Sequence, residues 1–381
     1  LHGWRGGVTA GTLFVLPGFV SILALSILYA VYQQADLVLA LFFGLKAATL
    51  AVVVEAVFRI GARALKNRVM IGIAASAFVA IFFFELPFPL IVLAAGMIGI
   101  AGGRVRPDQF CVIQSPAADD EEAGIAISDA TAVHTLPSWG RAARVSTLWV
   151  GLWVSPIALL YATLGPQHVL TIESVFFSKA AVVTFGGAYA VLAYIAQQAV
   201  EVYGWLQPGE MLDGLGMAET TPGPLIQVVQ FVGFMGAYRH PAPFDPIVAA
   251  ILASVITTWV TFVPCFLWIF LGAPYIERLR GNRLLSAGLS AITAAVVGVI
   301  LNLSVWFAAH VAFARVAEWR GFGVRLLVPD PSSADPAAIA IAVAAFIALF
   351  RLQWNIIVTL AVAAAVGIIY SLLARPWVLA A

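Results

Sequence analysis

The chain has 381 residues, of which 62% are hydrophobic and only 10% are charged. Soluble domains carry about 25% charged residues, so this composition excludes a soluble globular protein. The formal net charge of +1 gives no indication of a nucleic-acid partner. Because the apolar runs are longer than the roughly 10-residue strands of membrane β-barrels, we predict an all-α fold, a polytopic transmembrane helical bundle of about ten spans.

The start of the chain and its cysteines define further expectations. The chain opens on Leu1 and enters membrane-grade sequence almost at once, without an identifiable signal peptide, so we expect an N-terminal part to precede it. Cys111 and Cys265 lie far apart and in different settings, which argues against a disulfide or a metal site. We expect no metal and no cofactor.

The first half of the chain contains four predicted spans, at residues 8–33, 37–60, 69–84 and 88–102. Pro17 and Gly18 predict a kink in the first of them. In the second, Glu55 and Arg59 are four residues apart and share a helix face, which favours a structural ion pair. The basic residues between this span and the next have no acidic neighbour, which predicts a cytoplasmic loop: Arg59, Arg63, Lys66 and Arg68.

A polar segment separates the two halves. Residues 103–144 include the acidic run Asp119 to Glu122 and three prolines, so we interpret them as a linker without a fold of its own. The predicted organisation is therefore residues 1–102 as the remainder of a first transmembrane half, the linker, and residues 145–381 as a second half.

The second half begins with a predicted span at residues 145–164. Residues 167–200 are too long for one crossing and are interrupted at Phe185-Gly186-Gly187. Beyond a further broken segment, the predicted spans are residues 246–271, 284–313, 337–350 and 354–373, with a loop rich in arginine before the last two.

The broken segment lies between Glu201 and Arg239, and its centre is Thr220-Thr221-Pro222-Gly223-Pro224. Two prolines and a glycine cannot continue one helix, because each proline lacks an N–H and disfavours helical geometry in the preceding residue. Pro224 is suited to the first turn of a new helix, whose free N–H groups and positive dipole end favour an anion. In a membrane, such a break is tolerated where it is buried or lines a watery cavity, which is where transporters bind substrate.

An internal repeat is visible in the sequence. The segment from Phe14 to Phe19, with Pro17, resembles that from Thr261 to Phe266, with Pro264, and Gly44 to Val53 resembles Gly288 to Val297. The two pairs occur in the same order with nearly the same spacing. Matching loops differ in basic charge, which predicts inverted repeats, although arginines in the loop after residue 313 weaken this inference. By this repeat, the partner of the Thr220 to Pro224 break is expected upstream of Leu1.

The motifs of the second half resemble the C-terminal half of the chromate ion transporter family. They are, in order, Phe185-Gly-Gly-Ala-Tyr189, Trp205-Leu206, Glu210-Met-Leu-Asp213, Ala218-Glu-Thr-Thr-Pro-Gly-Pro224 and Gln230-Phe-Val-Gly-Phe234. The match is close over residues 178–239, and the first half lacks both family hallmarks. The resemblance implies a carrier in the cell inner (cytoplasmic) membrane that exports chromate, a tetrahedral dianion similar to sulfate, and gives chromate resistance, driven by the membrane potential or a proton gradient.

The candidate site combines the two breaks with the basic residues nearest to the membrane interior. Alternatives stay open: the Pro-Gly-Pro break and the glycine pair could serve packing alone, and Lys179 could extend to an interface. Glu219, beside the break, is a candidate proton carrier or a cap for the freed N–H groups. The candidate substrate-binding residues are Phe185, Gly186, Gly187, Thr220, Thr221, Pro222, Gly223, Pro224, Leu225, Gln227, Lys46 and Lys179.

Other functions compete with chromate export. A site made of N–H groups and a cation recognises the charge and tetrahedral shape of an anion more than its central atom. Sulfate or another oxyanion is therefore an alternative substrate. A multispan enzyme acting on lipid-linked substrates would need a polar catalytic cluster, and we find no metal-ligand pair or nucleophile motif. A pure scaffold is disfavoured by the cost of intramembrane lysines. The expected partners are an oxyanion and the lipid bilayer, with a homodimer as a further possibility.

Overall fold

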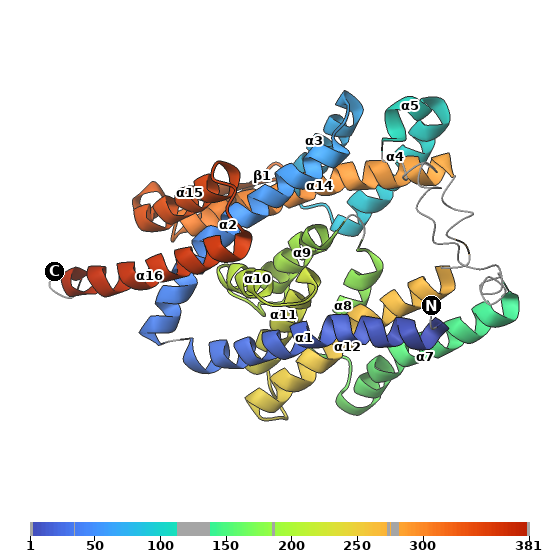
Figure 1. Ribbon diagram of the computed structural model, residues 1–381, viewed down its shortest axis with the longest axis horizontal. Helices are drawn as coiled ribbons and strands as arrows, with labels where there is room; N and C mark the ends of the chain where they lie inside the picture. The colour runs from blue at the N-terminus through green and yellow to red at the C-terminus, as the bar shows by residue number, and fades with distance from the viewer. Residues whose placement is uncertain are drawn as a thin grey trace, which may run out of the picture.

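The structure is a computed structural model that describes residues 3–33, 35–112, 138–184, 187–272, 275 and 282–378. It is an assembly of helices with one small β-hairpin (Figure 1). The helices before the hairpin are α1 (Gly3–Tyr32), α2 (Asp36–Ala64), α3 (Arg68–Phe84), α4 (Phe88–Val105), α5 (Pro107–Phe110), α7 (Trp139–Leu164), α8 (Val169–Val182), α9 (Ala188–Gln197), η3 (Gln198–Val202), α10 (Glu210–Thr220), η4 (Leu225–Gln227), α11 (Val228–Arg239), α12 (Pro246–Gly272) and α14 (Arg283–Ala312). After it come η6 (Pro331–Ser333), α15 (Pro336–Phe350) and α16 (Ile356–Val378).

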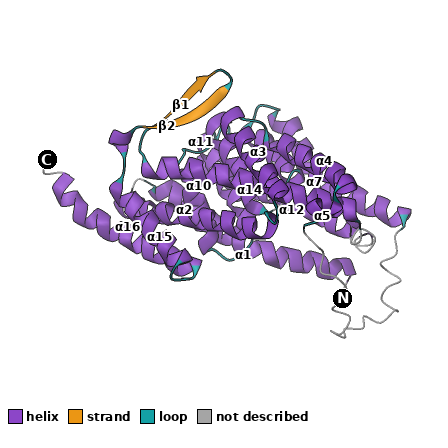
Figure 2. Ribbon diagram, turned by 90° about the horizontal axis from the view of Figure 1, so that it is seen from above, coloured by secondary structure: helices purple, strands orange, loops and turns teal. Residues whose placement is uncertain are grey.

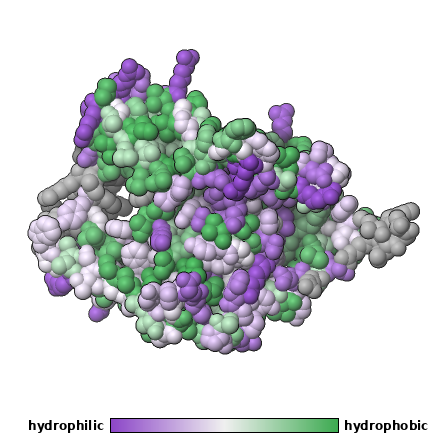
Figure 3. All heavy atoms as spheres, turned by 180° about the vertical axis from the view of Figure 1, so that it is seen from behind, coloured by the Kyte–Doolittle hydropathy of each residue, from purple (hydrophilic) through white to green (hydrophobic). Residues whose placement is uncertain are grey.

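Seven helices of the described residues are long and apolar enough to cross a membrane, and α3 and α15 are shorter apolar helices. Many large hydrophobic side chains are exposed on the outside, such as Leu93, Met97 and Leu372. Figure 3 shows broad hydrophobic areas on one face of the molecule. A soluble protein rarely exposes so much apolar surface, whereas lipid tails accommodate it. The all-α, multi-pass prediction is confirmed.

The interrupted helices occupy the middle of the molecule. In Figure 1, α9, α10 and α11 lie between α2, α3 and α14 on one side and α1 and α12 on the other. Residues 210–218 of α10 and residues 228–237 of α11 are all buried. The two helices with the least lipid-accessible surface are thus the two that flank the Pro-Gly-Pro break.

Helices from each half of the chain pack against a helix of the other half. Helices α3 and α4 of the first half pack on α14 of the second, while α15 and α16 of the second half pack on α2 of the first. The close contacts are glycines in both cases: a methyl group on Gly367 would lie 2.9 Å from the Gly44 Cα, and one on Gly99 would lie 2.8 Å from the Gly288 Cα. Gly44 and Gly288 are equivalent in the predicted repeat. At each of these two positions, a helix from the other half packs through a glycine of its own.

The matching helices run in opposite directions. At one end of the molecule, Asn67 Nδ2 donates to the Gln109 carbonyl at 2.7 Å, and Cys111 Sγ lies 3.3 Å from the Arg283 carbonyl oxygen. α2 ends close to this point, whereas α14 begins there, as inverted repeats require. The same end gathers the basic residues Arg63, Lys66, Arg68, Arg104, Arg106 and Arg283.

The segment after α14 differs from the predicted loop. It contains an antiparallel hairpin of β1 (Val316–Gly321) and β2 (Val324–Pro329), which stands out from the helices in Figure 2. Its arginines are paired: Arg320 with Glu85 at 2.9 Å, and Arg325 with Glu85 and Glu201 at 3.1 Å each. These arginines are paired with acids, but the positive-inside rule counts basic residues and not net charge, so they still weigh against the orientation that the basic end indicates.

Other differences concern boundaries. α7 begins at Trp139, so the last six residues of the predicted linker are helical, and the first helix begins five residues before the predicted span. Residues 113–137 of the linker, which include the acidic run, lie outside the described residues.

Candidate anion-binding site

The Pro-Gly-Pro segment ends one helix and starts another. α10 ends at Thr220, Thr221 is extended, and Gly223 has φ +127°, a conformation that favours glycine. Pro224 precedes the short turn η4, which leads directly into α11. The helix break is therefore present where the sequence predicts it.

The break packs against the Pro17-Gly18 segment of α1. A methyl group on Gly223 would lie 2.9 Å from the Gly18 Cα, and one on Gly18 would lie 3.0 Å from the Pro222 carbonyl oxygen. One turn further, Gln230 Nε2 donates to the carbonyl of Phe19 at 3.1 Å. Two backbones approach each other here because both carry glycine, which explains why Gly18 follows Pro17.

The break is exposed to solvent, whereas most of each flanking helix is buried. Thr220, Pro222 and Gly223 are exposed, although residues 210–218 and 228–237 on either side are buried. Among the N–H groups at the start of the new helix, that of Gln227 donates to the Pro224 carbonyl at 2.9 Å. This leaves the N–H groups of Leu225 and Ile226, in the first turn, as the candidate donors.

The Gln227 side chain is occupied as well as its backbone. Its Nε2 donates to Gln230 Oε1 at 2.6 Å and to Thr258 Oγ1 at 3.0 Å, whereas its Oε1 is buried without a partner. Gln227 therefore fixes the start of α11 against α12.

The second interruption lies next to the first. α8 ends at Val182 and α9 begins at Ala188, with Gly187 at φ +113° between them. The Tyr189 hydroxyl donates to the Glu219 carboxylate, so a residue two positions after Gly187 is joined to a residue three positions before Pro222. Phe185 and Gly186 lie outside the described residues.

Lys46 reaches the centre of the molecule but is paired. Its Nζ lies 3.5 Å from Asp213 Oδ2, and the same oxygen accepts from the Tyr29 hydroxyl at 2.9 Å. The Asp213 side chain is only 4% exposed. The sequence interpretation missed this partnership, although two acids three residues apart at the start of an apolar helix, Glu210 and Asp213, were the signal for it.

Glu210 belongs to a second ion pair beside the first. Arg239 Nη2 lies 2.6 Å from Glu210 Oε1, and Arg239 Nη1 donates to the Trp205 carbonyl. This pair joins the start of α10 to the end of α11. The two outer ends of the α10–α11 segment are thus held together by an ion pair, and the break lies between them.

The remaining predicted charges are distributed more simply. Lys179 is exposed in the last turn of α8, where a cation is favoured by the helix dipole. Glu55 and Arg59 form the predicted pair at 3.3 Å, and both act electrostatically on Glu219. The region of the breaks is thus surrounded by compensated charges, with Lys179 as the basic candidate residue whose charge is not offset by a described ion pair.

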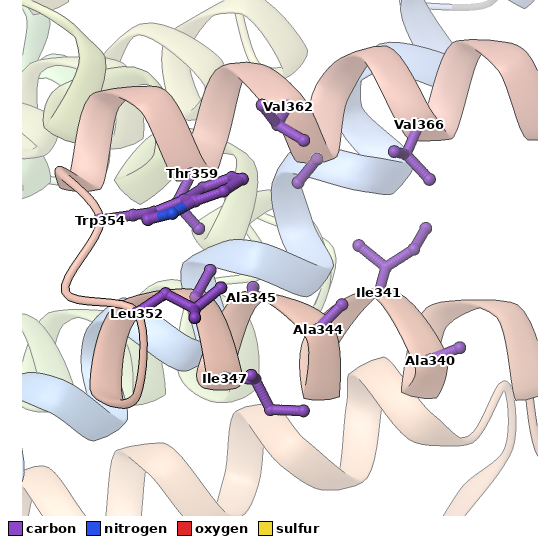
Figure 4. Close-up of a pocket in the computed structure, with 12 residues that line it drawn as sticks. Ala340, Ile341, Ala344, Ala345, Ile347, Leu352, Trp354, Thr359, Val362 and Val366 are labelled. Carbon is purple, nitrogen blue, oxygen red and sulfur yellow. The ribbon is translucent and has the colours of Figure 1, made fainter.

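A large groove lies elsewhere and does not suit an anion. It is a groove of about 490 Å³ between α15 and α16. Figure 4 shows Trp354, Ile341 and Val366 among its apolar lining, with Thr359 as a polar exception. A dianion would lose its hydration there without compensation, so the breaks remain the candidate site.

The fold and the paired breaks define a class of protein, a multi-pass membrane protein with discontinuous helices at its centre, as secondary carriers have. The family model described as chromate transporter matches residues 1–100 and 174–368. The chain therefore belongs to the chromate transporter family, and the resemblance seen in its motifs is confirmed. No solved structure matches it.

Three relatives show how far the similarity extends. The chromate transport protein of Pseudomonas aeruginosa is 32% identical over 303 residues, which are 78% of this chain and 62% of the relative. The probable chromate transport protein of Synechococcus elongatus is 24% identical, over 78% of this chain and 65% of the relative. The chromate transport protein of Cupriavidus metallidurans is 23% identical, over 77% of this chain and 63% of the relative. The chain thus spans less than two thirds of the length of these relatives.

Proposed function

We propose that this protein carries chromate across the cytoplasmic membrane in the export direction and thereby gives chromate resistance. The proposal is supported by membership of the family and by the names of the relatives. The observation that carries it is the break at Thr220 to Gly223, which is exposed at Thr220, Pro222 and Gly223 and lies between the buried residues 210–218 and 228–237. Such a break is a place for a substrate within a membrane protein.

The proposed receptor combines backbone and side-chain groups. The N–H groups of Leu225 and Ile226 and the dipole of α11 favour an anion by about 0.3–1 kcal/mol when exposed, and up to about 2 when partly buried. Lys179 adds positive potential from the end of α8, and Lys46 adds less because Asp213 offsets its charge. The hydroxyl groups of Thr220 and Thr221 lie at the same place but donate to carbonyls of α10, that of Thr220 to Gly216 and Met217 and that of Thr221 to Ala218.

The charge of the substrate supports export as the direction of transport. A dianion that leaves a cell with a negative interior gains about 2.3 kcal/mol per charge per 100 mV of membrane potential. Glu219 remains the candidate proton carrier beside the substrate, because its hydrogen bond to Tyr189 connects the two breaks. A change in the charge of Glu219 would alter that connection.

Counterflow in proteoliposomes tests the proposal. The full-length natural protein is reconstituted with internal chromate, and uptake of labelled chromate is measured with sulfate or molybdate as competitor. Chromate counterflow above that of empty liposomes is expected. Equal competition by sulfate would change the substrate to tetrahedral oxyanions in general, and lipid turnover without counterflow would favour the enzyme alternative. Light scattering of the purified protein would test the homodimer.

A further inference from the structure

Glu173 is a buried carboxyl group that the proposed anion site does not use. It lies on α8, is 0% exposed, and neither of its oxygens has a hydrogen-bond partner. In a membrane protein, an ionisable residue in the interior is costly and is by default functional. Nothing in the α8 pattern singles Glu173 out, because its neighbours Thr171 and Ser174 make the turn look polar.

The carboxyl group sits in a notch on α11. A methyl group on Gly236 would lie 2.5 Å from Glu173 Oε1, and one on Gly233 would lie 3.6 Å from Oε2. The same methyl group on Gly233 would lie 2.4 Å from Thr257 Oγ1 of α12. The Thr257 hydroxyl group is buried without a partner as well, so the notch holds a second unused polar group. Ser254, one turn before Thr257 on α12, also has a buried hydroxyl group without a partner.

No charged group of the described residues compensates Glu173. The helices α7, α11 and α12 pack on α8, and α12 has no charged residue. On α11, Arg239 is paired with Glu210. α7 carries Arg141 and Arg144 in its first two turns, and α8 itself carries the exposed Lys179.

An isolated carboxylate in such a place is so unfavourable that the group takes up a proton instead. We propose that Glu173 is a proton-binding site, neutral in this conformation, whose proton is linked to the occupancy of the anion site at the start of α11. The proton comes from water, binds one carboxylate oxygen, and returns to water when the notch opens. This link rests on the proposed function, whereas the presence of the proton does not.

The two sites share α11 and its contact with α12. Leu225 starts the helical segment and Gly233 is eight residues later, about 12 Å along a helix. Thr257 lies at the notch, and the next residue, Thr258, accepts from Gln227 at the anion end. An ionised Glu173 would repel a dianion at this distance enough to weaken its binding by about ten- to a hundredfold. Proton and anion therefore favour each other's binding.

The first experiment detects the proton directly. Infrared difference spectra of the full-length protein, recorded without any anion, should contain the carbonyl band of a protonated carboxylic acid that Glu173→Gln removes and Glu219→Gln retains. A spectrum unchanged by Glu173→Gln would overturn the proposal. Because this measurement needs no substrate, it decides the state of Glu173 even if neither chromate nor sulfate binds, a result that would refute the proposed function instead.

The second experiment measures the link. Sulfate, whose own charge is constant across the neutral range, is titrated at several pH values. Its affinity should rise as the pH falls, at most about tenfold per pH unit for one proton, and should become independent of pH in Glu173→Gln. Gly236→Ala, which crowds the carboxyl group, should shift this dependence, whereas the matched Gly151→Ala, which meets nothing within 4 Å, should not.

Three results would contradict the link. The first is a Glu173→Gln protein that keeps the full pH dependence. The second is loss of that dependence in Glu219→Gln alone, which would assign the coupling to Glu219. The third is an affinity that depends on sodium at constant pH only while Glu173 is present, which would make the notch a sodium site.

Discussion

At the scale of single residues, Lys46 is expected to stabilise the fold through its ion pair with Asp213. Lys46→Gln leaves a nearly buried carboxylate with the Tyr29 hydroxyl alone. Removal of one partner from a buried pair costs about 3–5 kcal/mol, and we expect the low end because the Lys46 side chain is 30% exposed. The melting temperature in detergent should fall, and Lys46→Gln with Asp213→Asn should recover most of it. A stable single variant would show that the pair is not structural.

Lys179 is expected to affect binding instead of stability. Lys179→Gln removes an exposed charge at the end of α8, so chromate affinity should weaken more at low salt than at high salt if the site is open to water. The free energy of unfolding should change by no more than about 0.5 kcal/mol, so the melting temperature should stay nearly the same. Unchanged affinity in both Lys46→Gln and Lys179→Gln would leave the N–H groups as the sole anion receptor.

Arg325 holds the hairpin to the helices. Its side chain is 4% exposed and contacts Glu85, Glu201 and Glu318. Arg325→Gln leaves three carboxylates together and should destabilise the protein by about 3 kcal/mol or more. Arg315→Gln is the matched control, because that pair with Asp330 is 70% exposed on the arginine side and such pairs contribute about 0–1 kcal/mol. Equal melting temperatures for the two variants would contradict this assignment.

Among the elements, the break between α10 and α11 determines whether a site exists. Pro222→Ala, Gly223→Ala and Pro224→Ala together allow one continuous helix, because alanine is a good helix former. The full-length triple variant should insert in the membrane but bind and transport no anion, since the free N–H groups and the local dipole end are lost. Transport of chromate at the normal rate would show that the break is structural.

The contact between the Pro-Gly-Pro break and α1 gives the break a partner. Gly223 and Gly18 touch through their backbones, so straightening the break would separate α1 from the site. This explains why a proline and a glycine occur together in both segments, although they are some two hundred positions apart in the chain.

For the whole molecule, the described structure predicts which ends share a side of the membrane. With Cys111 and Cys265 replaced by serine, single cysteines at Lys66 and Arg283 should be labelled from the cytoplasmic side, because both lie at the basic end. A cysteine at Phe322, the fully exposed tip of the hairpin, should be labelled from the opposite side. Labelling of Lys66 and Arg283 from different sides would refute the inverted repeat.

Local features of this protein were readable from the sequence. Long apolar runs predict membrane helices because hydrophobic burial depends on composition over some 20 residues. The breaks at Gly187 and at Thr221 to Pro224 were predictable because proline and glycine restrict or free the backbone at their own positions. The hairpin was missed, since the strand residues Val316–Gly321 and Val324–Pro329 carry charges that resemble a solvated loop.

The sequence by itself therefore determined the membrane class, the helix breaks and the family, because each depends on short segments. Only the tertiary structure decided which charges are compensated: Lys46 meets Asp213, Arg239 meets Glu210, and Glu173 meets no partner in the described chain. These outcomes depend on helices that are distant in the chain and adjacent in space. Electrostatic energy depends on the distance between groups and on their burial, and neither quantity is contained in the order of the residues.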